Sequence, residues 1–295
     1  VPPGYTNTNA SEVYDGTNWT ASPGTIGTAS RQGAASGTST AGLIFGGGTS
    51  PSALITTTQT FDGSTYTTVN SMNTARRGLA GSGTQTAAIA FGGSTPSPGY
   101  EVLTESWDGT SWAVSPVLAT GRQFIAGAVQ APSSASLAFS GFVPGATSAL
   151  TEEFNKSINT ITAAAWSAGD NIPTATSSFG GAGTRDATLV FGGYVGGPGV
   201  TGYVATTFEY DGSSWTGGGS MPVKRNSPIN FGTQTAAVAF AGNNQPPTGG
   251  VYLNSGDHYD GSSWTSTPNN YPTTLSNSGS VGTQTAGLAF AGYTS

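Results

Sequence analysis

An eleven-residue pattern that occurs six times limits the possible folds more than any other feature of this chain. Its copy at 232–242 reads GTQTAAVAFAG, which is a turn, an apolar run, a phenylalanine and a closing pair of small residues. The copies lie at 37–47, 83–93, 131–141, 183–193, 232–242 and 282–292. Their phenylalanines are 46 to 52 residues apart. Self-similarity at a period of about 50 residues predicts a repeat architecture, because each unit is too small to bury its apolar face alone.

A second pattern alternates with the first: an aromatic residue, Asp-Gly, two variable residues and a second aromatic residue. Asp-Gly between two β-type runs predicts a tight hairpin, because glycine tolerates positive φ and aspartate accepts hydrogen bonds from turn amides. The regular copies lie at 14–19, 61–66, 107–112, 210–215 and 259–264. The remaining copy is longer by seven residues, between Phe154 and Trp166. We interpret this insertion as drift rather than as a docking contact.

Each unit predicts four strands, named a to d in chain order. Strand a is rich in Gly, Ala and Ser, as at 77–82, and a GTQT turn joins it to strand b, as at 87–91. A longer loop leads to strand c, as at 102–107, and the Asp-Gly turn leads to strand d, which starts at Trp112. Strands b and c carry the β-branched and aromatic residues that favour strands. A strand of small residues fits the crowded axis of a β-propeller, so we expect strand a to be innermost.

Six such units predict an all-β fold, a six-bladed β-propeller with four-stranded antiparallel blades, as a single domain over 1–295. The expected blades lie at 31–69, 76–115, 122–168, 175–217 and 225–266, and the sixth combines 275–295 with 5–21. The chain starts with a c–d hairpin at 12–20 and ends with an a–b pair at 275–292. The ring is therefore expected to close by pairing N-terminal strands c and d with C-terminal strands a and b, which removes a free edge.

Two parts of the unit carry a family resemblance. The small pair after strand b, as at Gly46-Gly47 and Gly92-Gly93, and the aromatic-turn-tryptophan after strand c resemble kelch repeats of the galactose-oxidase-like propellers. The sequence pattern GTQTAAxAFGG…WDGTSW is more similar to the kelch-like repeats of virion proteins of tailed phages, marine ones especially. The resemblance covers essentially the whole chain and implies a structural or recognition module at the tail or another exposed appendage. Propellers host many functions, so the repeat is specific for the fold rather than for an activity.

The two faces of the predicted disc differ in their loops. Strand direction alternates within a blade, so the a–b and c–d turns share one face, the turn face, and the b–c and d–a loops share the other, the loop face. The turns are short and repeated, whereas the b–c loops at 46–54, 92–102, 192–204 and 242–253 differ from blade to blade. Variable loops on a repeated scaffold commonly carry binding, the alternative being solvated loops without a special role. The candidate contacts are Tyr100, Tyr194, Tyr203, Asn243, Asn244, Tyr252 and Tyr271.

Composition argues against several classes of protein. The net charge is −6 and only Lys156 and Lys224 are lysines, whereas nucleic-acid binding needs clustered Lys and Arg. The chain has no cysteine, so disulfides and thiolate metal sites are excluded. The sequence contains no run of about 18 apolar residues, so no membrane-spanning helix is predicted. The chain begins at Val1 rather than Met, so we expect a processed chain or a piece of a longer polypeptide.

No sequence pattern marks a set of catalytic or metal-ligating residues. Galactose oxidase needs copper ligands and a cysteine cross-linked to tyrosine, whereas this chain has no cysteine and one histidine, His258, which we interpret as an ordinary strand residue. No serine lies in a nucleophile elbow, and no pair among the 14 acids is marked for glycoside hydrolysis. The Asp of the Asp-Gly turn recurs in nearly every blade, which favours a structural role in the fold. One carboxylate per turn supplies few of the roughly six to eight oxygen ligands that calcium takes. We therefore expect no enzymatic activity, no metal and no cofactor.

Two further groups of residues have structural interpretations. Tryptophans at the start of strand d are expected to pack between blades rather than to serve as sugar platforms: Trp19, Trp112, Trp166, Trp215 and Trp264. Four arginines near strand a are expected to face the mouth of the channel: Arg31, Arg77, Arg122 and Arg225. A sialidase-like site would need three arginines around a carboxylate, but pairing with strand-c acids such as Glu12, Glu105 or Glu152 is the simpler expectation.

These observations favour a non-enzymatic module on the virion surface that binds a host-surface glycan, a host-surface protein or another virion protein. The alternative is a carbohydrate-binding (lectin-like) or carbohydrate-active domain of a secreted bacterial protein. An intracellular kelch-type adaptor is a third interpretation, less compatible with a chain that has no cysteine and only 7% charged residues.

Overall fold

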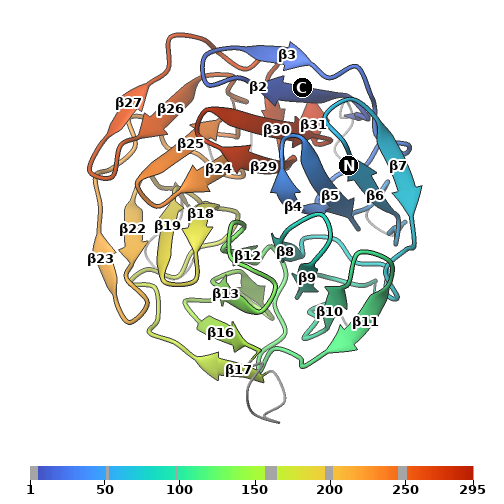
Figure 1. Cartoon of the computed structure of the whole chain (residues 1–295). Coiled ribbons are helices and arrows are strands. Elements are labelled where there is room, and N and C mark those ends of the chain that lie inside the picture. Colours follow the sequence, from blue (N-terminus) through green and yellow to red (C-terminus); the bar gives the residue numbers. More distant parts are fainter. Residues whose placement is uncertain are drawn as a thin grey trace.

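The computed structural model describes residues 6–50, 53–96, 99–156, 165–196, 202–244 and 251–294, and these form a ring of six sheets around a central axis (Figure 1). Each sheet has four antiparallel strands, and the strand nearest the axis is the first of the four in blades one to five. The predicted all-β, six-bladed fold is therefore confirmed. The described residues contain no helix that is long and apolar enough to cross a membrane.

Blades one to three follow one another along the chain. Blade one is β4 (Ala34–Thr38), β5 (Ala41–Phe45), β6 (Thr58–Phe61) and β7 (Tyr66–Val69). Blade two is β8 (Ala80–Gly83), β9 (Ala88–Phe91), β10 (Thr104–Trp107) and β11 (Trp112–Ser115). Blade three is β12 (Ala126–Gly127), β13 (Ala135–Phe139), β16 (Thr151–Asn155) and β17 (Ala165–Ala168).

Blades four to six complete the ring. Blade four is β18 (Gly180–Thr184), β19 (Ala187–Phe191), β22 (Thr207–Tyr210) and β23 (Trp215–Gly217). Blade five is β24 (Ile229–Thr233), β25 (Ala236–Phe240), β26 (Gly256–Tyr259) and β27 (Trp264–Ser266). Blade six is β29 (Gly279–Thr283), β30 (Ala286–Phe290), β2 (Ser11–Tyr14) and β3 (Trp19–Ala21).

The two ends of the chain close the ring as the strand order predicts. Strand β2 pairs with β30, so that Ser11 lies opposite Phe290. A further small sheet, which the sequence did not indicate, also joins the ends: β1 (Thr6–Asn7) pairs with β31 (Tyr293–Thr294), and β31 pairs with β28 (Leu275–Ser276). Strands β1 and β31 therefore lie side by side (Figure 1).

The structure of the GTQT turn explains why its glycine and glutamine repeat from blade to blade. Gly83 has φ of +114°, and a Cβ there would lie 2.8 Å from the Cα of Ala88, so only glycine fits. The Gln85 side chain donates to the backbone oxygens of Gly42 and Phe61 in blade one, at 3.1 and 2.9 Å. Gln234 and Gln284 make the same pair of bonds to the blades before them. The repeated glutamine therefore fastens each of these blades to its neighbour.

The phenylalanine of strand b packs into the next blade. Phe91 is fully buried, and its ring lies 5.1 Å from Trp166 of blade three. A Cβ on Gly127, in strand a of that blade, would lie 2.6 Å from the Phe91 ring. The small residues of strand a thus make room for the preceding phenylalanine. The same phenylalanine–tryptophan contact recurs at Phe45–Trp112, Phe139–Trp215, Phe191–Trp264 and Phe240–Trp19, which confirms that the tryptophans pack between blades.

The Asp-Gly turns use their aspartates locally. The Oδ1 atom of Asp62 accepts hydrogen bonds from the amides of Ser64 and Thr65, at 2.8 and 2.7 Å. These bonds favour the ionised form and lower the pKa of the carboxyl. Asp211 and Asp260 have equivalent bonds, and the pKa of each is lowered to about 2. The repeated aspartates therefore serve the turns.

A tyrosine–acceptor contact links the outer halves of blades three to six. Tyr210 donates to Glu153 of the preceding blade at 2.8 Å, and Tyr259 donates to Glu209 in the same manner. At the next seam the Tyr14 hydroxyl lies 2.9 Å from Nε2 of His258. His258 thus takes the strand position held by an acid in the two blades before it, as an ordinary strand residue would.

Candidate functional site

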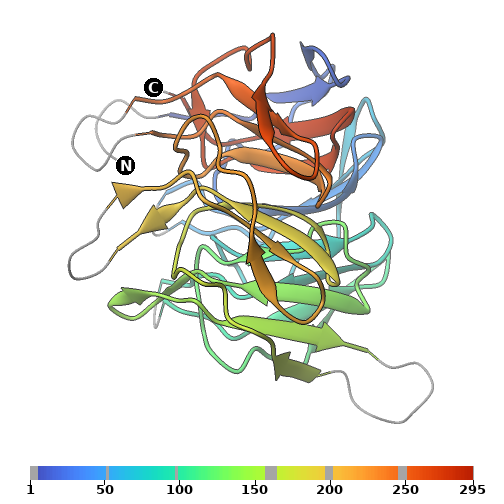
Figure 2. The same cartoon turned by 90° about the vertical axis from the view of Figure 1, so that its left-hand side faces the viewer.

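The loop face carries small hairpins in two of its b–c loops. Two small hairpins rise from the b–c loops, β14–β15 (Phe142–Val143 and Ala146–Thr147) in blade three and β20–β21 (Tyr194–Val195 and Gly202–Tyr203) in blade four. They lie on the same side of the disc as both ends of the chain (Figure 2).

The mouth of the central channel lies on this face and is built from one residue of each blade in a left-handed conformation. The six residues, here called the mouth ring, have φ between +49° and +59°: Gln32, Gly78, Phe124, Ser178, Ser227 and Asn277. Five of them are not glycine, and positive φ costs such residues free energy. Backbone bonds between blades hold the conformation, as from the amide of Gly78 to the oxygen of Gln32 at 2.8 Å and from Ser227 to Ser178 at 2.6 Å.

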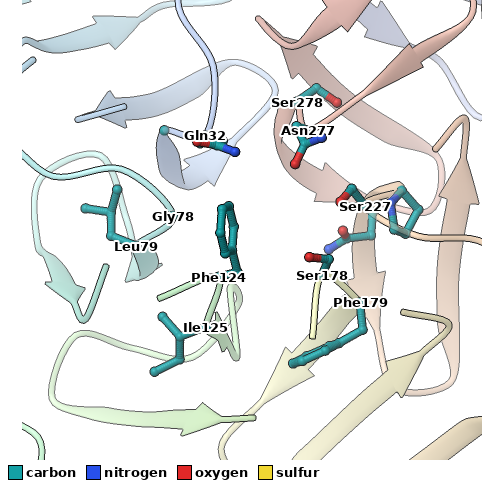
Figure 3. A pocket seen from close by; sticks show the side chains of 13 residues that line it. Gln32, Gly78, Leu79, Phe124, Ile125, Ser178, Phe179, Ser227, Asn277 and Ser278 are labelled. Atoms are coloured by element: carbon teal, nitrogen blue, oxygen red, sulfur yellow. The ribbon is translucent and has the colours of Figure 1, made fainter. Parts of the chain in front are cut away.

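The side chains at the mouth divide into an apolar and a polar half (Figure 3). Leu79, Phe124, Ile125 and Phe179 come from blades two to four and line one side. The opposite side is mainly amide and hydroxyl, from residues 32, 178, 227, 277 and 278, with Pro228 beside Ser227. The cavity has a volume of about 130 Å³, and none of its lining residues is charged. Such a surface suits an uncharged partner with one apolar side.

The channel below the mouth is narrow and is crossed at the turn face. It has a volume of about 160 Å³ and is lined by strand a of several blades. Gln130 of blade three donates to the backbone oxygen of Gly282 in blade six at 2.8 Å. Val129 packs against the cluster that contains Val281. A segment of blade three therefore spans the axis at the turn face.

A groove opens beside the mouth, at the seam of blades three, four and five. It has a volume of about 250 Å³. It is lined by Phe142, Ser177, Ser178, Tyr194, Tyr203 and Asn226. Ser178 belongs to the mouth ring as well, so the groove and the mouth are contiguous.

Some of the residues proposed from the sequence meet at this groove. Tyr194 and Tyr203 are bridge partners, and their ring centroids lie 6.0 Å apart. Asn243 pairs by backbone with Asn226, which lines the groove, and with Tyr252. Asn243 and Tyr252 therefore lie at the blade-five side of the groove. Asn244 follows directly. Tyr100, which is half-buried, belongs to the b–c loop of blade two and does not line the groove.

Tyr271 does not belong to the loop-face surface, which corrects the sequence interpretation. Its side chain is 3% exposed, and its ring lies 4.7 Å from Trp19 in the core. It fills the buried position of the d–a loop held in the other blades by Ile26, Met72, Leu118, Ile172 and Met221. Aligning the d–a loops would have shown this, because an apolar residue stands there in every unit.

The arginine assignment also needs correction in blades one and two. Arg31 and Arg77 hold equivalent positions, since each pairs by backbone with its b–c loop, at Gly48 and Ser94, and Arg31 donates to Asn7 at 3.2 Å. Arg76, not Arg77, is the counterpart of Arg122 and Arg225, and all three are fully buried. They form ion pairs with strand-c acids: Arg76–Glu105 at 2.9 Å, Arg122–Glu152 at 2.7 Å and Arg225–Asp257 at 2.8 Å. The expected pairing is thus confirmed at Glu105 and Glu152. It is wrong at Glu12, which has no ion pair among the described residues. The buried pairs direct positive charge into the blades rather than toward the mouth.

The insertion between Phe154 and Trp166 falls largely at 157–164, outside the described residues. Among the residues that the structure describes, no three His, Asp or Glu side chains are grouped as metal ligands.

Comparison with known proteins supports the architecture. No family model matches the chain, and no curated protein matches its sequence. In a comparison of structures, 169 solved chains match. One of them, described as "Structure of YjhT", has a TM-score of 0.68 and 13% sequence identity, over 84% of this chain and 87% of that chain. At this identity the likeness concerns the fold, and the chain is therefore a β-propeller of six blades.

Proposed function

We propose that this propeller is a non-enzymatic recognition module that binds its partner with the loop face, centred on the mouth ring. The observation that carries the proposal is the mouth itself: five non-glycine residues are held in a costly backbone conformation around an uncharged cavity. Backbone strain of this kind clusters at active sites and ligand-binding sites in proteins. The turn face, in contrast, is built largely from repeated GTQT and Asp-Gly turns, whose glutamine and aspartate side chains bond within the fold.

The use of the acidic residues agrees with a binding role. Glu105, Glu152 and Asp257 are in buried ion pairs, and Glu153 and Glu209 accept bonds from tyrosines of the next blade. The first three carboxylates are thereby engaged within their own blades and the last two between neighbouring blades, which leaves the mouth to amide, hydroxyl and apolar groups.

The resemblance of the repeats to kelch-like virion proteins of tailed phages supports a place on an exposed virion appendage. There the loop face would meet a host-surface glycan, a host-surface protein or another virion protein. The aromatic groove supports the alternative setting, a carbohydrate-binding domain of a secreted bacterial protein, because tyrosine and phenylalanine offer apolar faces to a sugar.

The test is binding of the purified chain to a glycan array and to candidate host cells, with Phe124→Gly as the decisive variant. Glycine stands at this ring position in blade two, so the substitution relieves the positive φ while it removes the ring. We expect stability within about 1 kcal/mol of the original, since relief of strain offsets lost packing. We expect binding to fall at least tenfold. Unchanged binding by this variant would contradict the proposal.

A further inference from the structure

We propose that the groove at the seam of blades three to five binds one neutral pyranose residue of a glycan. This inference rests on the proposed recognition function and names a ligand class for part of the loop face. The groove holds two of the tyrosines singled out from the sequence, and it is continuous with the mouth through Ser178.

The walls of the groove are aromatic and come from two hairpins. Phe142 is contributed by β14, and Tyr194 and Tyr203 by β20 and β21. The two tyrosine rings are nearly perpendicular, at 77°, so they form a corner rather than a flat stack. A pyranose has C–H faces that pack on such rings and equatorial hydroxyls that reach polar groups beside them.

The polar groups of the groove can bond to hydroxyls. The amide of Asn226 both donates and accepts, and Ser178 and the tyrosine phenols do so through their hydroxyls. Ser177 also lines the groove and is fully buried, and its hydroxyl has no hydrogen-bond partner among the described residues. Rotation of this side chain toward the groove would let a sugar hydroxyl satisfy it, whereas an unpaired buried hydroxyl is costly.

The charge of the groove selects a neutral ligand. None of the six lining residues carries a charge at neutral pH. Burial and the neighbouring Tyr194 raise the pKa of Tyr203, so its phenol remains a donor. A carboxylate or ammonium group would lose water here without gaining an ionic partner. This favours hexoses and N-acetylhexosamines over acidic sugars.

The size of the groove suits one ring. Its volume of about 250 Å³ falls just below the roughly 300–1,000 Å³ of pockets for drug-sized molecules. The groove is open to the loop face, so the rest of a glycan can continue along the mouth.

The experiment measures binding of methyl glycosides of glucose, galactose, mannose and N-acetylglucosamine by ligand-observed NMR and calorimetry, with N-acetylneuraminic acid as the charged probe. We expect at least one neutral glycoside to bind and the charged sugar to fail. Tyr194→Ala and Tyr203→Ala should each weaken binding at least tenfold. Ser177→Ala should weaken it roughly 3- to 10-fold, the worth of one hydrogen bond, without lowering the melting temperature.

Two matched variants separate binding from folding. Ser136→Ala removes another fully buried hydroxyl, one bonded to Ser82 between blades two and three, and should leave glycoside binding unchanged. Tyr203→Phe keeps the aromatic wall if the alanine variant is unstable. Binding of none of the neutral glycosides, or binding unaffected at Tyr194 and Tyr203, would overturn the inference. If the protein still bound cells through Phe124 in that case, the proposed function would stand without the sugar groove.

Discussion

Blade six retains the acid of the buried ion pairs but not its partners, and this predicts opposite effects for one substitution at two equivalent sites. In blade two, Glu105 is 2% exposed and accepts bonds from Arg76 at 2.9 Å and from the Asn73 amide at 2.7 Å. In blade six, Leu275 occupies the arginine position, because its backbone oxygen accepts the same interblade bond that the Arg76 oxygen accepts. Pro272, which has no N–H, takes the place of Asn73.

Within the part of the chain that the structure describes, Glu12 is therefore half-buried without a charged partner, and loss of water raises its pKa from 4.5 to about 7. Because the folded-state pKa lies above the unfolded value, the folded protein retains a proton that the unfolded chain releases between these values. Stability from this group is therefore lost as pH rises from about 4.5 to 7. A tenfold change in acidity is worth about 1.4 kcal/mol, and the partly exposed carboxylate is screened by water, so the penalty above pH 7 is about 1 to 2 kcal/mol.

The assay is urea unfolding of Glu12→Gln and Glu105→Gln at pH 5 and pH 8. Glu12→Gln should gain about 1 to 2 kcal/mol at pH 8 and little at pH 5. Glu105→Gln should lose about 3 to 5 kcal/mol at both pH values, since it leaves Arg76 buried without its counter-charge. A loss of stability for Glu12→Gln at pH 8, similar to that of Glu105→Gln, would refute the reasoning.

Three other predictions concern the ring itself. Gln85→Ala should lower the free energy of unfolding by about 1 to 3 kcal/mol in urea titrations, because two backbone oxygens of blade one lose their donor; an unchanged midpoint would contradict the interblade role. Deleting residues 1–21 removes β1 to β3 and leaves blade six with two strands, so the melting temperature in calorimetry should fall by more than about 10 °C; a melting point within a few degrees of the full chain would be incompatible with closure by both ends. Trp112→Phe should cost about 1 to 2 kcal/mol, because the indole N–H donates to Thr58 at 3.0 Å, and it should leave any glycan binding intact; loss of binding with unchanged stability would instead favour a sugar platform.

The blade count and ring closure could be predicted because each rests on a feature repeated through the chain. Phe91 must meet a small residue of the next blade, and Gln85 must reach back to the preceding one, so the requirement recurs and leaves a period in the sequence. A chain that starts on strand c and ends after strand b can complete the ring in one way.

Features that occur once left no period to find. The crossing of the axis by Gln130 depends on an irregular copy in blade three, where APSSASLAFSG replaces the usual turn. The left-handed mouth ring is hidden because five of its six members are not glycine, and Gly78 alone signals the conformation.

The errors at Tyr271 and Arg77 have a common cause, an uncertain register within the d–a loop. A polar-tipped aromatic such as Tyr271 suits either a wet surface or a buried site. Likewise, two adjacent arginines in blade two cannot be distinguished without knowing which side chain points inward. Inter-blade alignment resolves both, since buried positions repeat and exposed ones do not.

The central claim, recognition through the loop face, is tested most directly by blocking each face in turn. The chain has no cysteine, so single cysteines can be placed and labelled with a bulky maleimide polymer. Val251→Cys lies on the loop face at a side chain that is 51% exposed, and Thr110→Cys lies in an exposed turn of the turn face. The account predicts that labelling at 251 abolishes binding to host cells or glycans and labelling at 110 leaves it intact. Loss of binding from the turn-face label alone would contradict it.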